Sequence, residues 1–147
     1  QDADEKGLRQ ILNFGHTFGH ALEAFSNYKL SHGYAVSQGM LVESRISVEA
    51  NKLRKDEEAR TRSMIKAFGF PLSVNIGINA SKIIELMRSD KKSRGSRPRF
   101  VLIDKIGKVK SKGNNFSFEV EEKTIEKAIR SCQNRALQKR QVSLKND

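Results

Sequence analysis

The apolar side chains of the first ninety residues recur every three or four positions, which is the period of an amphipathic α-helix. This pattern predicts helices over residues 8–25, 32–53, 56–68 and 81–89. The buried strip of the second helix is expected to contain Ala35, Gly39, Val42, Ile46, Ala50 and Leu53. Asp56 is expected to cap the third helix, and Gly69 and Pro71 are expected to end it.

The period shortens after residue 98. The apolar run 99–103 suits a strand, and alternating apolar residues at 116, 118 and 120 predict a second strand after a turn at 112–115. A last helix is expected over 122–133, followed by a polar, basic segment that should fray. The pattern therefore predicts a mainly α fold with a small two-stranded β element. We divide it into one domain over 1–133 and a flexible tail over 134–147.

Two glycines, Gly15 and Gly19, lie four residues apart on one strip of the first predicted helix. Glycine costs about 1 kcal/mol of helix stability at such a position. Small residues spaced in this way allow another helix or a ligand to come close to the backbone. We therefore expect a close approach at this strip.

The composition restricts the class of protein. The chain has 147 residues, 37% of them hydrophobic, and no apolar run approaches the ~20 residues of a membrane span. The acidic start, without methionine, is not a signal peptide, so we expect the chain to be part of a longer protein. The single cysteine, Cys132, excludes an internal disulfide and fits a reducing, cytoplasmic location; a buried, inert thiol is the favoured interpretation.

The formal net charge is +11, which is compatible with nucleic acid or with anionic small molecules as partners. The excess is concentrated in residues 88–113 and in the C-terminal segment. Aromatic residues are not interleaved with these cations, and the chain has no tryptophan. We therefore expect solvated basic faces, with neither a nucleic-acid nor a membrane partner.

The three histidines of the chain cluster in one stretch. His16 and His20 are spaced i, i+4, which places both imidazoles on one helical face, and His32 follows twelve residues later. All three could hold one divalent metal, or two could bind it while the third handles protons or phosphate. Alternatively, His16 and His20 are satisfied core residues and His32 only starts a helix. The chain has no zinc-protease motif, dinucleotide loop or phosphate loop.

Several sequence blocks, in order and at similar spacing, resemble the 3-dehydroquinate synthase family over residues 7 to about 107. The blocks are Gly7-Leu8-Arg9, the segment 12–23, His32-Gly33 with Ala35-Val36 and Gly39-Met40, Gly69 with Pro71, Asp90-Lys91-Lys92 with Gly95, Phe100-Val101-Leu102 and Ile106-Gly107.

The resemblance implies the helical C-terminal domain of a two-domain enzyme of the shikimate pathway. Family members convert 3-deoxy-D-arabino-heptulosonate 7-phosphate to 3-dehydroquinate and phosphate. They use zinc or cobalt, together with NAD that is held mainly by an N-terminal domain. The implied partners are this domain, the phosphorylated sugar acid and, in the full enzyme, a second copy in a homodimer. This chain alone is not expected to turn over substrate.

The resemblance also implies roles for individual residues. His16 and His32 correspond to metal ligands, and the third ligand is a glutamate in the N-terminal region. His20 corresponds to a catalytic histidine near the substrate phosphate. Arg9, Asn13 and Lys91 correspond to substrate-binding positions, Lys91 also being catalytic. Guanidinium and ammonium groups suit phosphate and carboxylate.

One position departs from the family pattern. The family usually has glutamate after His32-Gly33, whereas this chain has Tyr34, which removes a carboxylate near a metal ligand. Two other interpretations stay open. One is a related sugar-phosphate cyclase resembling 2-deoxy-scyllo-inosose synthase. The other is a non-catalytic basic binding module, left after loss of the NAD domain.

Overall fold

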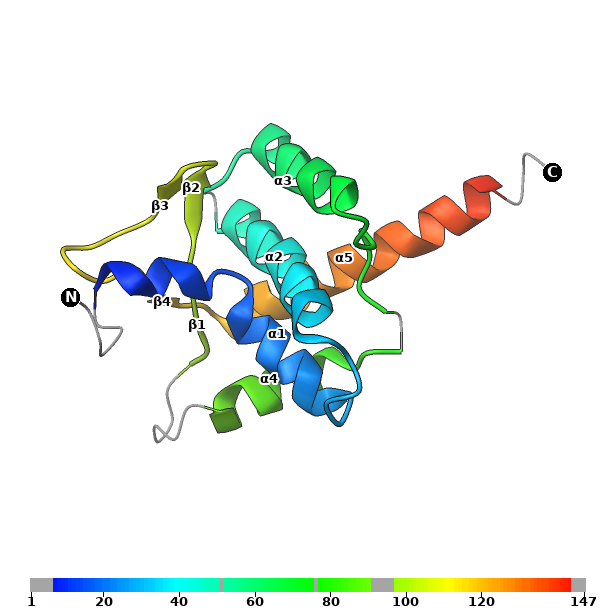
Figure 1. Cartoon of the computed structure of the whole chain (residues 1–147), viewed down its shortest axis with the longest axis horizontal. Coiled ribbons are helices and arrows are strands. Elements are labelled where there is room, and N and C mark those ends of the chain that lie inside the picture. Colours follow the sequence, from blue (N-terminus) through cyan, green and yellow to red (C-terminus); the bar gives the residue numbers. More distant parts are fainter. Residues whose placement is uncertain (1–6, 51, 76, 91–96, 144–147) are drawn as a thin grey trace.

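The computed structural model describes residues 7–50, 52–75, 77–90 and 97–143, without the side chains of 90 and 134–143. Five α-helices and one 3₁₀-helix make up most of this part of the chain (Figure 1). The helices are η1 (Leu8–Asn13), α1 (His16–Phe25), α2 (His32–Glu49), α3 (Lys55–Ala67), α4 (Ala80–Asp90) and α5 (Glu122–Ser143). The strands are β1 (Arg99–Phe100), β2 (Ile103–Lys105), β3 (Lys108–Val109) and β4 (Phe118–Glu119). The predicted mainly α fold is confirmed.

Helix α2 is the centre of the packing. It contacts α1, α3 and α5, while α4 packs against both α1 and α5 (Figure 1). The largest fully buried apolar side chains include Phe18 of α1, Leu41 and Ile46 of α2, Ile83 of α4 and Ile125 of α5. Because side chains from four helices interdigitate in one core, the orientation of α1 relative to α2 is fixed by the packing of the whole bundle.

The predicted helix over 8–25 is wrong as a single element. Residues Leu8–Asn13 form a 3₁₀-helix, and α1 begins only at His16. The break falls at Gly15, whose φ of +86° lies in the left-handed region and is favourable mainly for glycine. The apolar period continues across this residue, so the pattern alone did not reveal the interruption.

The β structure is larger than the predicted strand pair. Two antiparallel sheets of two strands each are present, with orders β1-β4 and β2-β3. The run 99–103 is split into β1 and β2, and β3 was not predicted. The predicted turn is present, since Lys112 and Asn115 form an isolated bridge.

Helix ends account for the other differences. Arg54 occupies the N-cap of α3, so the predicted cap Asp56 lies inside the first turn, where its charge complements the helix dipole. Helix α2 ends at Glu49 rather than near 53, and Ala50 is only half-buried. Helix α5 continues to Ser143, ten residues beyond the predicted end. The division into a domain and a flexible tail stays a prediction.

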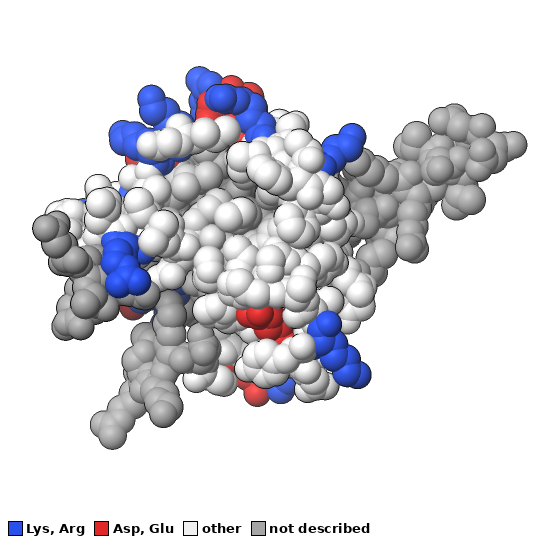
Figure 2. Space-filling view, in the orientation of Figure 1, with Lys and Arg blue, Asp and Glu red and all other residues white. Residues whose placement is uncertain are grey.

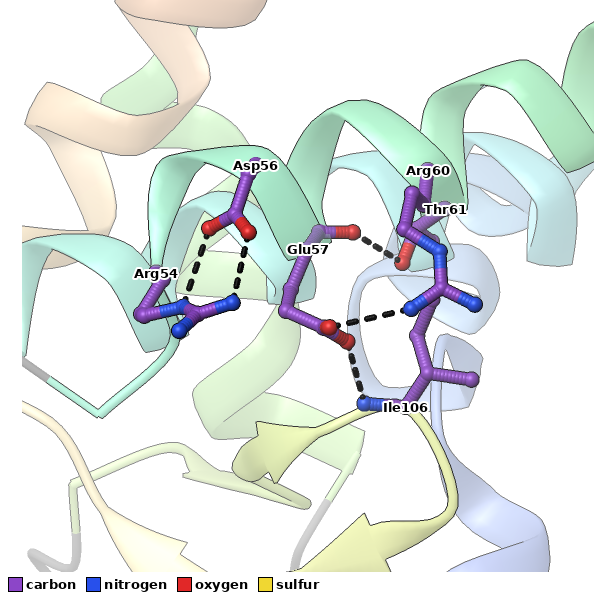
Figure 3. Close-up of polar contacts among 6 residues, drawn as sticks. All are labelled: Arg54, Asp56, Glu57, Arg60, Thr61 and Ile106. Atoms are coloured by element: carbon purple, nitrogen blue, oxygen red, sulfur yellow. Dashed lines mark hydrogen bonds and ion pairs between the residues drawn. The ribbon is translucent and has the colours of Figure 1, made fainter.

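Glu57 joins α3 to the turn between β2 and β3 (Figure 3). Its carboxylate accepts a hydrogen bond of 2.8 Å from the backbone N–H of Ile106, and the Arg60 guanidinium lies 3.0 Å away. The hydrogen bond from Ile106 is the main reason that the pKa of Glu57 is lowered. The ionised carboxylate therefore holds the small sheet against the helical bundle.

Cys132 is buried on α5, as predicted for an inert thiol.

Within the described part of the chain, no helix has both the length and the apolar character needed to span a membrane.

Candidate metal centre

The three imidazole rings converge at the junction of α1 and α2. The ring centroid of His16 lies 5.5 Å from that of His20 and 5.3 Å from that of His32, and the centroids of His20 and His32 are 5.9 Å apart. The rings thus form a nearly equilateral triangle from two helices. This arrangement agrees with the predicted convergence of His16 and His32, whereas the assignment of ligands stays a prediction.

Three glycines allow the two helices to approach closely enough to form this triangle. A Cβ atom added to Gly39 of α2 would lie 1.8 Å from the carbonyl oxygen of Gly15. A Cβ on Gly19 would lie 3.2 Å from the backbone of Ala35 and Val36. The predicted close approach is therefore a contact between α1 and α2. Gly15 and Gly19 each precede a histidine directly, so this contact sets the positions of His16 and His20.

The turn between the helices places His32 at the first position of α2. Asn27 and Tyr28 adopt positive φ values of 51° and 57°, a conformation that non-glycine residues seldom adopt. The chain reverses through these two residues. As a result, the start of α2 lies beside α1.

His16 has the most buried environment of the three. Its Nδ1 atom is buried and has no hydrogen-bond partner among the described residues. Burial is the largest cause of its lowered pKa; the Phe14 backbone and the Glu23 carboxylate oppose this effect, and the imidazoles of His20 and His32 add to it. The neutral imidazole, which is the form that can bind a metal, is therefore favoured at this position.

Glu23 is a site residue that sequence reasoning missed. It lies on α1, three residues after His20, and its Oε1 atom is 3.1 Å from Nδ1 of His32. One ligand atom from each of His20, Glu23 and His32 lies within 4.8 Å of the others. The i, i+3 spacing from His20 was the available signal, because it places the carboxylate on the same helical face.

The donor set fits a zinc-type cation. Imidazole nitrogen and carboxylate oxygen are the usual zinc ligands besides thiolate. Two sets are geometrically available: His16 with His32, and His20 with Glu23 and His32. The buried, unpartnered Nδ1 of His16 favours the first set, since a buried polar atom normally has a partner. His32 belongs to both sets.

The other predicted site residues, Arg9, Asn13 and Lys91, do not belong to the triangle of imidazole rings. Arg9 and Asn13 lie on η1, which directly precedes the histidine-bearing helix. Arg9 is exposed and Asn13 is half-buried. Lys91 lies outside the described residues, so its predicted catalytic and substrate-binding roles stay predictions.

Comparison with known proteins identifies relatives of this chain. A family model described as the 3-dehydroquinate synthase C-terminal region matches residues 1–93. Proteins named 3-dehydroquinate synthase from Dehalococcoides mccartyi and Nostoc punctiforme are 43% and 40% identical over 107 and 110 residues. These alignments cover 73% and 74% of this chain and 30% of each relative. The chain thus spans about a third of the length of the curated relatives that it matches.

Solved structures show a similar fold. The chain superposes on 2-deoxy-scyllo-inosose synthase, in complex with carbaglucose-6-phosphate, NAD+ and Co2+, with a TM-score of 0.78 and 21% identity, over 90% of this chain and 36% of the other. It superposes on 2-epi-5-epi-valiolone synthase from Streptomyces hygroscopicus, with NAD+ and Zn2+ bound, with a TM-score of 0.69 and 22% identity. That alignment covers 84% of this chain and 33% of the other.

Proposed function

Because this chain belongs to the 3-dehydroquinate synthase C-terminal family, we propose that it is the metal- and substrate-binding part of a 3-dehydroquinate synthase. The complete enzyme converts 3-deoxy-D-arabino-heptulosonate 7-phosphate to 3-dehydroquinate and phosphate. The observation that carries this proposal is the triangle of imidazoles, with centroids 5.3 to 5.9 Å apart, on a chain of this family.

In this proposal His16 and His32 supply two ligands to a divalent cation. The structural relatives contain Co2+ or Zn2+, and both are cations that imidazoles bind well. Held by these two histidines, such a cation would polarise a hydroxyl or carbonyl oxygen of the substrate and would lower the pKa of the hydroxyl that is oxidised. A glutamate from an N-terminal domain, which also holds NAD, completes the site.

The other residues bind and orient the anionic substrate. His20 lies beside both proposed ligands and is exposed, so it can reach a phosphoryl group of a substrate bound over the cation. Arg9 and Asn13, on η1, supply a cation for carboxylate or phosphate and an amide for a hydroxyl. Lys91 adds a second cation, which would assist phosphate departure by neutralising the developing charge.

The test is a chimera that joins the N-terminal domain of the Dehalococcoides mccartyi relative to this chain. With NAD and zinc, it should release phosphate from 3-deoxy-D-arabino-heptulosonate 7-phosphate, and the double variant His16→Ala/His32→Ala should not. Faster phosphate release from glucose 6-phosphate would instead assign a cyclase of the 2-deoxy-scyllo-inosose synthase kind. A folded chimera that binds NAD and zinc but releases no phosphate from either substrate would refute the proposal.

The binding-module alternative makes a different prediction. It requires salt-dependent binding to DNA that is tighter than binding to sugar phosphates. On the face drawn in Figure 2, Lys and Arg side chains lie in separate groups near the edge, with few charges in the centre. The described residues therefore form no continuous basic surface on this face, which a nucleic-acid interface there would need.

A further inference from the structure

We infer that Glu23 is a positioning residue, which fixes the tautomer and the orientation of His32 so that its Nε2 atom faces the metal. This inference deepens the proposed function and rests on it for the identity of the metal site. It assigns a role to a residue that the family resemblance left without one.

The first observation is the contact itself. The Glu23 Oε1 atom lies 3.1 Å from Nδ1 of His32. The His32 side chain is 57% exposed, whereas that of Glu23 is only 14% exposed. The His32 ring also lies beside the imidazoles of His16 and His20, but the contact with Glu23 is the hydrogen bond that can fix its orientation. The half-buried carboxylate of α1 is therefore the group that holds it.

The second step follows from hydrogen-bond chemistry. An ionised carboxylate only accepts hydrogen bonds, so the Nδ1 atom of a neutral His32 must carry the proton. The lone pair is then on Nε2, which becomes the only nitrogen that can bind a metal. A carboxylate that fixes a ligand histidine in this way also raises its basicity. A neutral histidine that is free in water prefers the opposite tautomer, with the proton on Nε2.

The third observation concerns Tyr34. Residue 34, two positions after His32, is a tyrosine and supplies no carboxylate. Glu23 reaches the same imidazole from the neighbouring helix, two turns after His16 on α1. The carboxylate that contacts His32 thus comes from α1.

The experiment is ¹⁵N NMR of the histidine side chains in the full 147-residue chain without metal, at about pH 8.5, two units above the ordinary histidine pKa. Only three imidazoles have to be assigned, and His32→Gln identifies the relevant signals. We expect His32 to carry its proton on Nδ1 in the unmodified chain and mainly on Nε2 in Glu23→Ala. Glu23→Gln should give an intermediate result, because an amide can either accept or donate.

Glu85→Ala is the matched control, since Glu85 is an exposed helical glutamate on α4 that pairs with Lys82. It should leave the tautomer of His32 unchanged. The same tautomer in the unmodified chain and in Glu23→Ala would overturn the inference, even if both proteins are fully folded.

Addition of zinc to saturation supplies a second readout. Zinc should shift the Nε2 resonance of His32 and leave Nδ1 protonated, and Glu23→Ala should weaken zinc binding by about 10–100-fold. Zinc on Nδ1, or unchanged affinity in Glu23→Ala, would overturn the inference, the former because a zinc-bound Nδ1 cannot donate a hydrogen bond to Glu23. Neither readout needs substrate or NAD. A chimera without turnover would therefore refute the proposed function and leave the result on Glu23 standing.

Discussion

The packing of α1 against α2 predicts that Gly39→Ala destabilises the protein. The added methyl group would lie 1.8 Å from the Gly15 carbonyl oxygen and 2.7 Å from its carbonyl carbon. Both atoms belong to the backbone, so they cannot turn aside as a flexible side chain would. The two helices must separate, and overpacking of this kind costs up to about 3 kcal/mol. The better helix propensity of alanine offsets about 1 kcal/mol, which leaves a net loss of roughly 2 kcal/mol.

Gly33→Ala is the matched control, because Gly33 lies on the same helix. A Cβ atom added to Gly33 would have the Phe70 side chain as its nearest neighbour outside this helix, at 4.0 Å. This variant should be as stable as the unmodified chain, or slightly more stable. Urea unfolding followed by circular dichroism measures both free energies of unfolding. Equal stability of Gly39→Ala and Gly33→Ala would refute the reasoning, since it would mean that the helices are not in backbone contact.

Three further variants test other parts of the structure. His16→Ala should weaken zinc binding to the chain, and unchanged binding in isothermal titration would reject His16 as a ligand. Glu57→Gln should lower stability at pH 7, because the lowered pKa means that the ionised form stabilises the fold. This contribution is complete above about pH 4.5 and is lost as the pH falls through the lowered pKa of the folded state, so the difference in the free energy of unfolding between the two proteins should narrow as the pH is lowered toward about 3; a difference that does not narrow would contradict the role of the charge. In an active chimera, Arg9→Ala should lower kcat/KM for the heptulosonate phosphate, because it removes a cation from the substrate site. The control Arg54→Ala, at an exposed arginine at the start of α3, should leave kcat/KM unchanged. Equal kinetics of the two variants would make Arg9 a surface residue only.

The sequence was informative where spacing alone determines position. The i, i+4 spacing of His16 and His20 places them on one face of any helix, so their proximity did not depend on tertiary structure. The small residues Gly15 and Gly19 correctly indicated a close approach. Neither observation identified α2 as the approaching element, because that depends on a turn through Asn27 and Tyr28 in conformations that these residues seldom adopt.

The missed features depend on tertiary contacts. The apolar period runs through Gly15, whose positive φ breaks the helix without changing the hydrophobic pattern. The short strand β3 has too few residues for a recognisable alternation. The role of Glu23 required knowing that His32 folds back against α1, since the two residues are nine apart and on different helices. Sequence patterns report local periodicity, and these three features arise from nonlocal packing.

Anomalous diffraction at the zinc edge, from crystals of the zinc-loaded chimera, tests the proposed metal centre most directly. We predict one zinc ion bound by nitrogen atoms of His16 and His32 at about 2.0–2.1 Å, with His20 outside the coordination sphere and Glu23 hydrogen-bonded to His32. Zinc bound by His20, Glu23 and His32 without His16, or zinc at a site away from these rings, would contradict it.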